Sequence, residues 1–141
     1  MIIKQVSIFV ENETGRLYDL MQTLADKEIN LNAATIAETG EYGILRCIVQ
    51  EPEKVVEILR NCNYSASLSD VIAVAIENKA GGLNKVLKIL AEKNIAVKYI
   101  YSTMQSDKDE AAIMVKVNDP QKAIDILEAE GVKLFALEDL K

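Results

Sequence analysis

The sequence lacks histidine and tryptophan altogether, and its 141 residues include only two cysteines and two prolines. Histidine is the commonest metal ligand and the main side chain that titrates near neutral pH, so most of the usual acid–base and metal chemistry is missing. The cysteines, Cys47 and Cys62, do not have the spacing of a metal or redox motif. We therefore expect neither catalysis nor a metal or organic cofactor.

The chain also lacks the features of a nucleic-acid-binding or membrane protein. Its net charge is −6, and its lysines are interspersed with acidic residues, whereas nucleic-acid binding requires a clustered basic face. No apolar run approaches the roughly 18 residues that span a bilayer. The first ten residues alternate like a strand and do not resemble a secretory leader. We expect a cytoplasmic protein that contacts neither nucleic acid nor membrane.

A repeat at an offset of 66 residues determines the predicted architecture. Segment 11–32 is identical to segment 77–98 at eight of 22 positions. These are the pairs Glu11/Glu77, Asn12/Asn78, Gly15/Gly81, Leu17/Leu83, Leu24/Leu90, Ala25/Ala91, Lys27/Lys93 and Ile29/Ile95. An internal repeat predicts two copies of one structural unit. Half of the residues are hydrophobic, which is enough to supply a core to each copy.

Each copy predicts the order strand–helix–strand–strand–helix–strand. Apolar residues that alternate with a period of two predict strands over residues 2–10, 29–38, 44–49, 64–68, 71–76, 95–104, 112–117 and 132–137. A turn is expected within each middle hairpin, over 39–43 and 105–110.

The helices of each copy follow from helical periodicity and from the prolines. An apolar stripe predicts a helix over 15–27, formed by Leu17, Leu20, Met21, Leu24 and Ala25, and the second copy repeats it with Leu83, Val86, Leu87, Leu90 and Ala91. Pro52 and Pro120 predict the first turn of the other helix of each copy. Asp119 is a good N-cap and Glu51 a poorer one.

Alignment of the copies also predicts the environment of several residues. Cys47 aligns with Val115 and is expected to be buried, whereas Cys62 aligns with Glu130 and is expected to be partly exposed. Matching helix ends at Asn63 and Gly131 suit a left-handed conformation.

We therefore predict an α+β fold with two tandem ferredoxin-like βαββαβ repeats, over residues 1–69 and 70–141. They are expected to pack into one body, with antiparallel sheets and helices on one side. Only Ser69 and Asp70 are available as a linker. The sheet face opposite the helices is apolar, with Phe9, Ala73, Ala75, Met114 and Phe135. An exposed apolar face usually marks an interaction surface, so a homodimer is expected.

The motif N-x-x-G-x-L stands at the first strand–helix junction of both copies, at residues 12–17 and 78–83. A βαββαβ unit with this motif resembles the ACT domain family of small-molecule-binding regulatory modules, and the resemblance covers essentially the whole chain. Thr14 and Ala80 stand where the family commonly has proline. The resemblance implies a regulatory domain that binds an amino acid.

The repeated junction is suited to hold a carboxylate. The first N–H groups of a helix have no intrahelical partners and attract anions, and glycine allows a ligand to approach the backbone. Asn12 and Asn78 offer both donors and acceptors to a zwitterion. The resemblance implies a second contact at the start of the second strand, across the interface with a neighbouring module. The candidate ligand-binding residues are Asn12, Glu13, Thr14, Gly15, Arg16, Leu17, Asn30, Leu31, Asn78, Lys79, Ala80, Gly81, Gly82, Leu83 and Ala96.

The two candidate sites are not equally equipped. Asn30 provides a second amide in the first copy, where the second copy has Ala96, so the first copy is expected to bind better. Alternative interpretations remain open: the glycines can serve only to shape a turn, the asparagines can be local turn-capping residues, and Arg16 can be a surface charge.

The first functional hypothesis is a stand-alone regulatory or sensing module that binds an amino acid and acts through a partner protein. The alternative is a structural interaction subunit with vestigial ligand sites. A small enzyme on a ferredoxin-like scaffold is the weakest hypothesis, because no nucleophile–base pair, metal cluster or pair of carboxylates can be assembled from the sequence.

Overall fold

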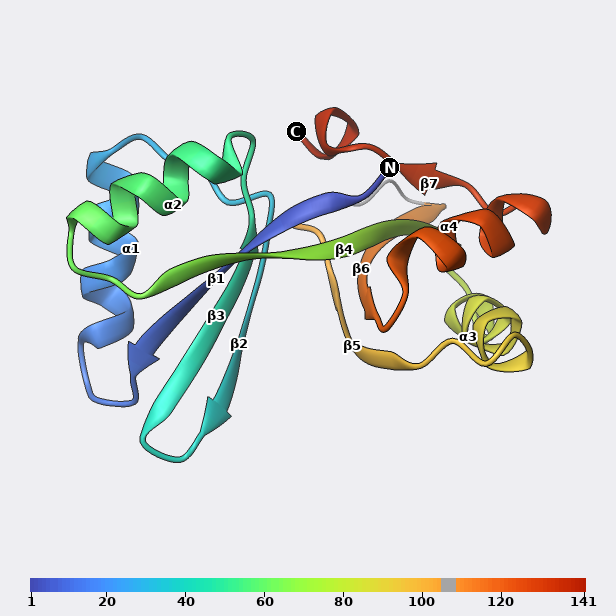
Figure 1. The fold of residues 1–141 in the computed structure, drawn as a ribbon, viewed down its shortest axis with the longest axis horizontal. Helices are drawn as coiled ribbons and strands as arrows, with labels where there is room; N and C mark the ends of the chain where they lie inside the picture. Colours follow the sequence, from blue (N-terminus) through green and yellow to red (C-terminus); the bar gives the residue numbers. More distant parts are fainter. Residues whose placement is uncertain (105–108) are drawn as a thin grey trace. The chain divides into compact units, whose positions relative to one another are not determined.

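The computed structural model describes residues 1–104 and 109–141. The elements, labelled in Figure 1, are β1 (Ile3–Glu11), α1 (Arg16–Asp26), β2 (Ala33–Thr39), β3 (Tyr42–Ile48), α2 (Pro52–Asn61), β4 (Ala66–Glu77), α3 (Gly82–Glu92), β5 (Val97–Ser102), β6 (Glu110–Val117), α4 (Pro120–Ala129), β7 (Leu134–Phe135) and the 3-10 helix η1 (Leu137–Leu140). Of the turn that the sequence predicts at 105–110, residues 105–108 lie outside the described part of the chain.

The chain divides into two compact units. The N-terminal unit is Lys4–Ser69, and the C-terminal unit combines Met1–Ile3 with Asp70–Lys141. Each unit follows the order strand–helix–strand–strand–helix–strand with antiparallel pairing, so the predicted tandem ferredoxin-like fold is confirmed.

In the N-terminal unit, the strand order is β2-β3-β1-β4. Antiparallel pairing places Val6 opposite Cys47 and Ile36 opposite Leu45. Alternate residues of these strands point to one face, where α1 and α2 cover them and form a buried core. That core consists of Val6, Ile8, Val10, Leu20, Leu24, Leu45, Cys47, Val49, Val55, Val56, Leu59 and Ala66.

In the C-terminal unit, β4 pairs with β6 on one side and with the short β7 on the other, and β5 completes the sheet beyond β6. The core under α3 and α4 repeats the first one, and consists of Ile72, Val74, Val86, Leu90, Ile95, Ile113, Val115, Val117, Ala123, Ile124, Leu127 and Leu134. The last predicted strand, 132–137, is shorter than expected. Its end gives way to η1, whose Leu140 is buried.

Strand β4 runs without a break through Ser69 and Asp70, the only residues that the sequence left as candidates for a linker. Aspartate is depleted in strands, but hydrogen bonds stabilise both residues here. The buried Gln5 donates from Nε2 to Ser69 Oγ at 3.0 Å, within the N-terminal unit. Lys116 Nζ donates to the Asp70 carbonyl at 3.0 Å, within the C-terminal unit.

Several local predictions are confirmed. Cys47 is buried, which raises the pKa of its thiol to about 12, and Cys62 is half-buried; both thiols are free. Asn63 and Gly131 have φ angles of 67° and 75°, in the left-handed region. The Asp119 side chain caps α4 by accepting a hydrogen bond from the Lys122 N–H at 3.1 Å.

Other predictions about exposure are wrong. Leu17 is 38% exposed and Ala25 is also exposed, so only the centre of the predicted stripe, Leu20 and Leu24, is fully buried. On the predicted interaction face, Ala73 and Met114 are buried, whereas Phe9 is 52% exposed. The apolar face is therefore smaller than the sequence suggests.

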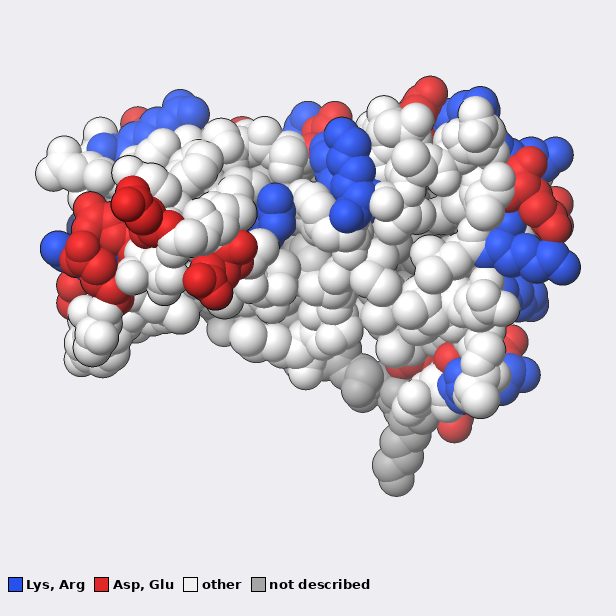
Figure 2. Space-filling model, turned by 90° about the horizontal axis from the view of Figure 1, so that it is seen from below, with Lys and Arg blue, Asp and Glu red and all other residues white. Residues whose placement is uncertain are grey.

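The surface view in Figure 2 shows acidic and basic side chains interspersed on the face that it draws. No continuous basic surface forms there among the described residues. No helix in the described ranges is long and apolar enough to span a bilayer.

Replacing Asp119 with alanine should lower the free energy of unfolding by about 1 kcal/mol, because the change removes the hydrogen bond to the first turn of α4. Urea denaturation followed by circular dichroism measures the effect. The matched control is Glu51→Ala at the start of α2, where the side chain makes no capping hydrogen bond. Equal losses in the two variants would contradict the capping role of Asp119.

Candidate functional site

A left-handed glycine precedes the first helix of each unit. Gly15 has φ 91° at the N-cap of α1, and Gly81 has φ 83° at the N-cap of α3. Residues with a side chain rarely adopt this conformation, so glycine is required at both positions. No side chain among the described residues caps either helix, in contrast to α4. The N–H groups of Arg16 and Gly82 donate to the carbonyls of Glu13 and Lys79, at 3.2 and 3.0 Å. The next N–H groups of each first turn remain available to an anionic group.

Asn12 joins this junction to the turn between β2 and β3. Its Nδ2 donates to the Gly40 carbonyl at 2.9 Å and to Glu38 Oε1 at 3.2 Å. Its backbone N–H donates to the Glu41 carbonyl at 2.9 Å. The side chain of Asn12 thus organises the loops around the site.

The second copy repeats the backbone part of this arrangement. The Asn78 N–H donates to the Asp109 carbonyl at 3.1 Å, at the position equivalent to Asn12 and Glu41.

Charged side chains of each junction pair locally. Arg16 Nε lies 3.4 Å from Glu11 Oε2 and 3.6 Å from Glu13 Oε2. In the second copy, Lys79 Nζ lies 2.6 Å from Glu77 Oε2. The hydrogen bond between these two groups lowers the pKa of Glu77 and raises that of Lys79, so the pair stays ionised.

Gly82 has a steric role that its equivalent does not share. A Cβ built on Gly82 would lie 2.1 Å from the Glu77 carbonyl oxygen, so the loop requires glycine there. The equivalent position in the first copy is Arg16, whose side chain is exposed. The two junctions therefore share a left-handed glycine but differ in the residue after it.

A cavity of about 380 Å³ opens beside the first junction. Its apolar wall includes Leu17 from α1 and Ile36 from the edge strand β2. The Ile36 residue is 47% exposed. Its full lining is Val10, Glu11, Asn12, Glu13, Leu17, Ile36, Glu38 and Gly43. Its volume is within the range of small-molecule sites.

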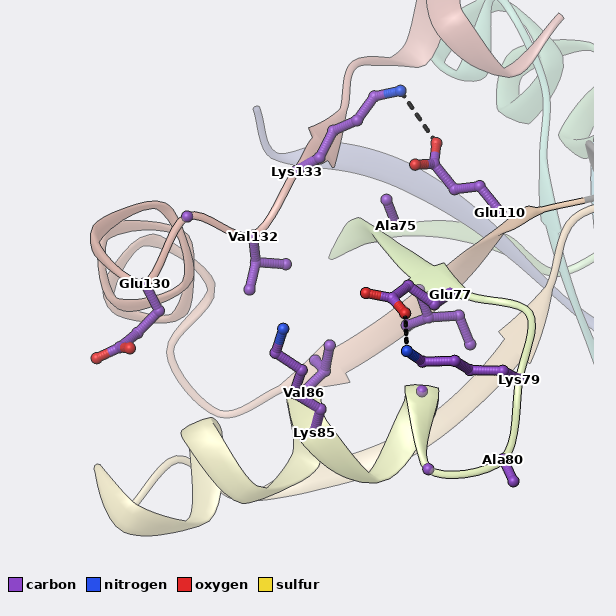
Figure 3. A pocket seen from close by; sticks show the side chains of 14 residues that line it. Ala75, Glu77, Lys79, Ala80, Lys85, Val86, Glu110, Glu130, Val132 and Lys133 are labelled. Atoms are coloured by element: carbon purple, nitrogen blue, oxygen red, sulfur yellow. Dashed lines mark hydrogen bonds and ion pairs between the residues drawn. The ribbon is translucent and has the colours of Figure 1, made fainter.

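A cavity of about 310 Å³ lies beside the second junction, and Figure 3 shows it from close by. The end of β4, the loop to α3, the first turn of α3 and the α4–β7 connection form its walls. The lining is Ala75, Ile76, Glu77, Lys79, Ala80, Gly81, Gly82, Lys85, Val86, Glu110, Glu130, Gly131, Val132 and Lys133. Lys133 Nζ lies 3.0 Å from Glu110 Oε1.

The candidates from the second strands lie elsewhere within each unit. The Asn12 N–H bonds to Glu41 at the start of β3, whereas the Asn32 N–H, beside Asn30 and Leu31, bonds to Ile48 at its end. Asn30 lines a separate cavity of about 420 Å³ near the start of α2. Within one unit, the structure therefore does not bring Asn30 or Leu31 to Asn12.

The second copy has the same arrangement. The Ala96 N–H donates to Asn118 Oδ1 at 3.1 Å at the end of β6, whereas Asn78 lies at its start. Five candidates from the junction loops line neither junction cavity: Thr14, Gly15, Arg16, Asn78 and Leu83.

Sequence reasoning missed several cavity residues. Ile36, Glu38 and Gly43 line the first cavity, and Lys85, Glu110 and Lys133 line the second. They come from strands β2, β3 and β6, from helix α3 and from the segment before β7, so none of them lies within the N-x-x-G-x-L motif. Within residues 1–104 and 109–141, no group of three or more histidine, cysteine, aspartate or glutamate side chains is placed to hold a metal.

The family model of the ACT domain pair matches residues 1–141. This chain belongs to the ACT domain pair family. Such domains are a regulatory type, so the protein is a small-molecule regulatory module. Among curated proteins, none matches the chain.

Several solved structures are similar to this chain. Protein BT0572 from Bacteroides thetaiotaomicron has a TM-score of 0.92 at 36% identity, over 99% of this chain and 96% of that one. The regulatory subunit of aspartate kinase from Thermus thermophilus has a TM-score of 0.66 at 13% identity, over 89% of this chain and 91% of that one. The regulatory subunit of aspartate kinase from Thermus flavus has a TM-score of 0.62 at 13% identity, over 89% of this chain and 90% of that one. At 13% identity the likeness concerns the fold alone.

Gly82→Ala should lower the free energy of unfolding by at least about 2 kcal/mol, because the new methyl group would collide with the backbone carbonyl of Glu77. The control is Arg16→Ala at the equivalent position, which removes only exposed ion pairs and should cost less than about 1 kcal/mol. Urea denaturation measures both variants. A Gly82→Ala protein as stable as the control would show that the loop relaxes freely.

Proposed function

We propose that the protein is an amino-acid sensor and that the cavity of the N-terminal unit is its ligand site. The observation that carries the proposal is the uncapped first turn of α1, which borders a cavity with an apolar wall and an acidic rim. A free amino acid has a carboxylate, an ammonium and a side chain, and the cavity offers a complement to each.

The complement follows from the positions of the lining residues. First-turn N–H groups of α1 receive the α-carboxylate. The rim carboxylate of Glu38, already oriented by the Asn12 amide, receives the α-ammonium. Leu17 and Ile36 contact the ligand side chain. In this arrangement Asn12 positions the rim, and a contribution from Asn30 requires a neighbouring module.

The output of the sensor is proposed to pass to a partner protein, since the sensor itself is proposed not to be an enzyme. The two fold relatives from Thermus are regulatory subunits of aspartate kinase, which supports a partner enzyme by analogy of fold. We place the protein in the cytoplasm, where a reducing environment suits its two free thiols.

A thermal-shift screen against the common amino acids tests the ligand proposal. A ligand at 100 times its dissociation constant should stabilise the protein by about 2.7 kcal/mol. Ile36→Trp should abolish the shift, because the larger side chain fills the cavity mouth. The matched control is Ile100→Trp on the edge strand β5, at a residue 38% exposed and outside both junction cavities. No shift with any amino acid would favour the structural subunit with vestigial sites.

We also propose a homodimer that forms through the exposed part of the N-terminal sheet. Phe9 and Tyr42 are exposed on the face opposite the helices, and an apolar surface of this kind is typical of an interface. Light scattering at micromolar concentration should give the dimer mass. Phe9→Glu should give the monomer, whereas Tyr18→Glu, at an exposed position on α1, should leave the dimer intact. A monomeric wild-type protein would overturn this proposal.

A further inference from the structure

The cavity of the C-terminal unit has a different charge arrangement from the cavity proposed as the amino-acid site. Two of its lysines are neutralised by ion pairs, Lys79 with Glu77 and Lys133 with Glu110. The Lys85 ammonium forms no ion pair or hydrogen bond within the described ranges, and its charge helps to lower the pKa of Glu77. Figure 3 shows its ammonium group pointing into the cavity, between the Glu77–Lys79 pair and Val132.

Two of the three carboxylates of this cavity are already paired with lysines, Glu77 with Lys79 and Glu110 with Lys133. The hydrogen bond to Lys79 lowers the pKa of Glu77, so this pair stays ionised. Glu130 is the third carboxylate of the lining, and Figure 3 shows it pointing away from the cavity. A ligand ammonium would therefore compete with a lysine for its carboxylate, whereas a ligand anion would not.

The N-terminal unit has the same fold without a lysine at the position equivalent to Lys85. A cavity of about 370 Å³ occupies the same place there, and its lining includes Asp19 where the second copy has Lys85. Ser65 stands in place of Lys133, and Tyr42 in place of Glu110. The change from aspartate to lysine is one of several differences between the two linings, and it places a cation only in the C-terminal copy.

We infer that the cavity of the C-terminal unit binds a small organic anion without an ammonium group, a dicarboxylate or a phosphate ester, and that Lys85 is its charged contact. The ammonium of Lys85 pairs with the anion, and the uncapped first turn of α3 borders the same space. This site differs from the proposed amino-acid site in both place and ligand class, so the protein responds to two kinds of small molecule.

Calorimetric titration of the full chain with succinate and, separately, with inorganic phosphate tests the inference. Lys85→Gln should weaken binding about tenfold or more, because a hydrogen bond to a charged group is lost. Lys88→Gln is the control: it makes the same change of net charge on the same helix, at an exposed lysine near Glu92 and outside the cavity, and should leave the affinity within about twofold. Ile36→Trp should leave anion binding unchanged.

Each result has a defined meaning. Binding of succinate alone assigns a carboxylate ligand, binding of phosphate alone assigns a phosphate ligand, and binding of both supports the anion site in general. Equal weakening by Lys85→Gln and Lys88→Gln would overturn the inference in favour of diffuse surface charge. Absence of binding at millimolar concentration would also overturn it, while the amino-acid screen at the N-terminal cavity would stand unaffected.

Discussion

The conformation of one glycine in each unit, Gly15 or Gly81, governs how the first strand connects to the first helix. A left-handed residue at the N-cap turns the chain sharply back across the sheet, so that the apolar stripe of α1 or α3 reaches the core. The same conformation leaves the cap without a side chain, because glycine has none to offer. Thus the residue that allows the helix to pack also leaves the N–H groups of its first turn without a side-chain cap.

The two copies share their core residues but differ in the surface residues beside the strand–helix junctions. Their cores use the same kinds of residue at equivalent positions. Leu20 and Leu24 correspond to Val86 and Leu90, and all four are buried. Differences gather on the surfaces beside the junctions. There a side chain changes the ligand chemistry at little cost in stability, because exposed positions away from caps and cores tolerate substitution.

The internal repeat made the fold predictable from sequence. It doubled every pattern, so strands, helices and even the left-handed ends at Asn63 and Gly131 could be assigned from two independent copies. The continuity of β4 through Ser69 and Asp70 could not be predicted, because local strand propensity does not include hydrogen bonds from Gln5 and Lys116, which are distant in sequence. Buried Ala73 and Met114 show the same limit, since alternation tells which face a residue takes but not what covers it.

The candidate sites were predictable only where they lie in a motif. The sequence identified the loops at 12–17 and 78–83, because glycine and asparagine have recognisable turn chemistry. It could not identify Ile36 or Lys85, which enter the cavities through strand pairing and helix phase. It also could not foresee that the Asn12 amide is engaged by Glu38 and Gly40.

That engagement would give the proposed sensor a physical route from ligand to response. Asn12, in the loop before α1, is bonded to Glu38 and to the β2–β3 turn, and both this loop and Glu38 line the cavity beside the first junction. A molecule that bridges the walls stabilises the arrangement in which both are in place, and it shifts the equilibrium only by its preference for that arrangement. The β2–β3 turn is exposed, so a partner protein could contact it directly. In the proposed sensor, ligand binding would reach the partner in this way, because the loops proposed to hold the ligand also form part of the outer surface.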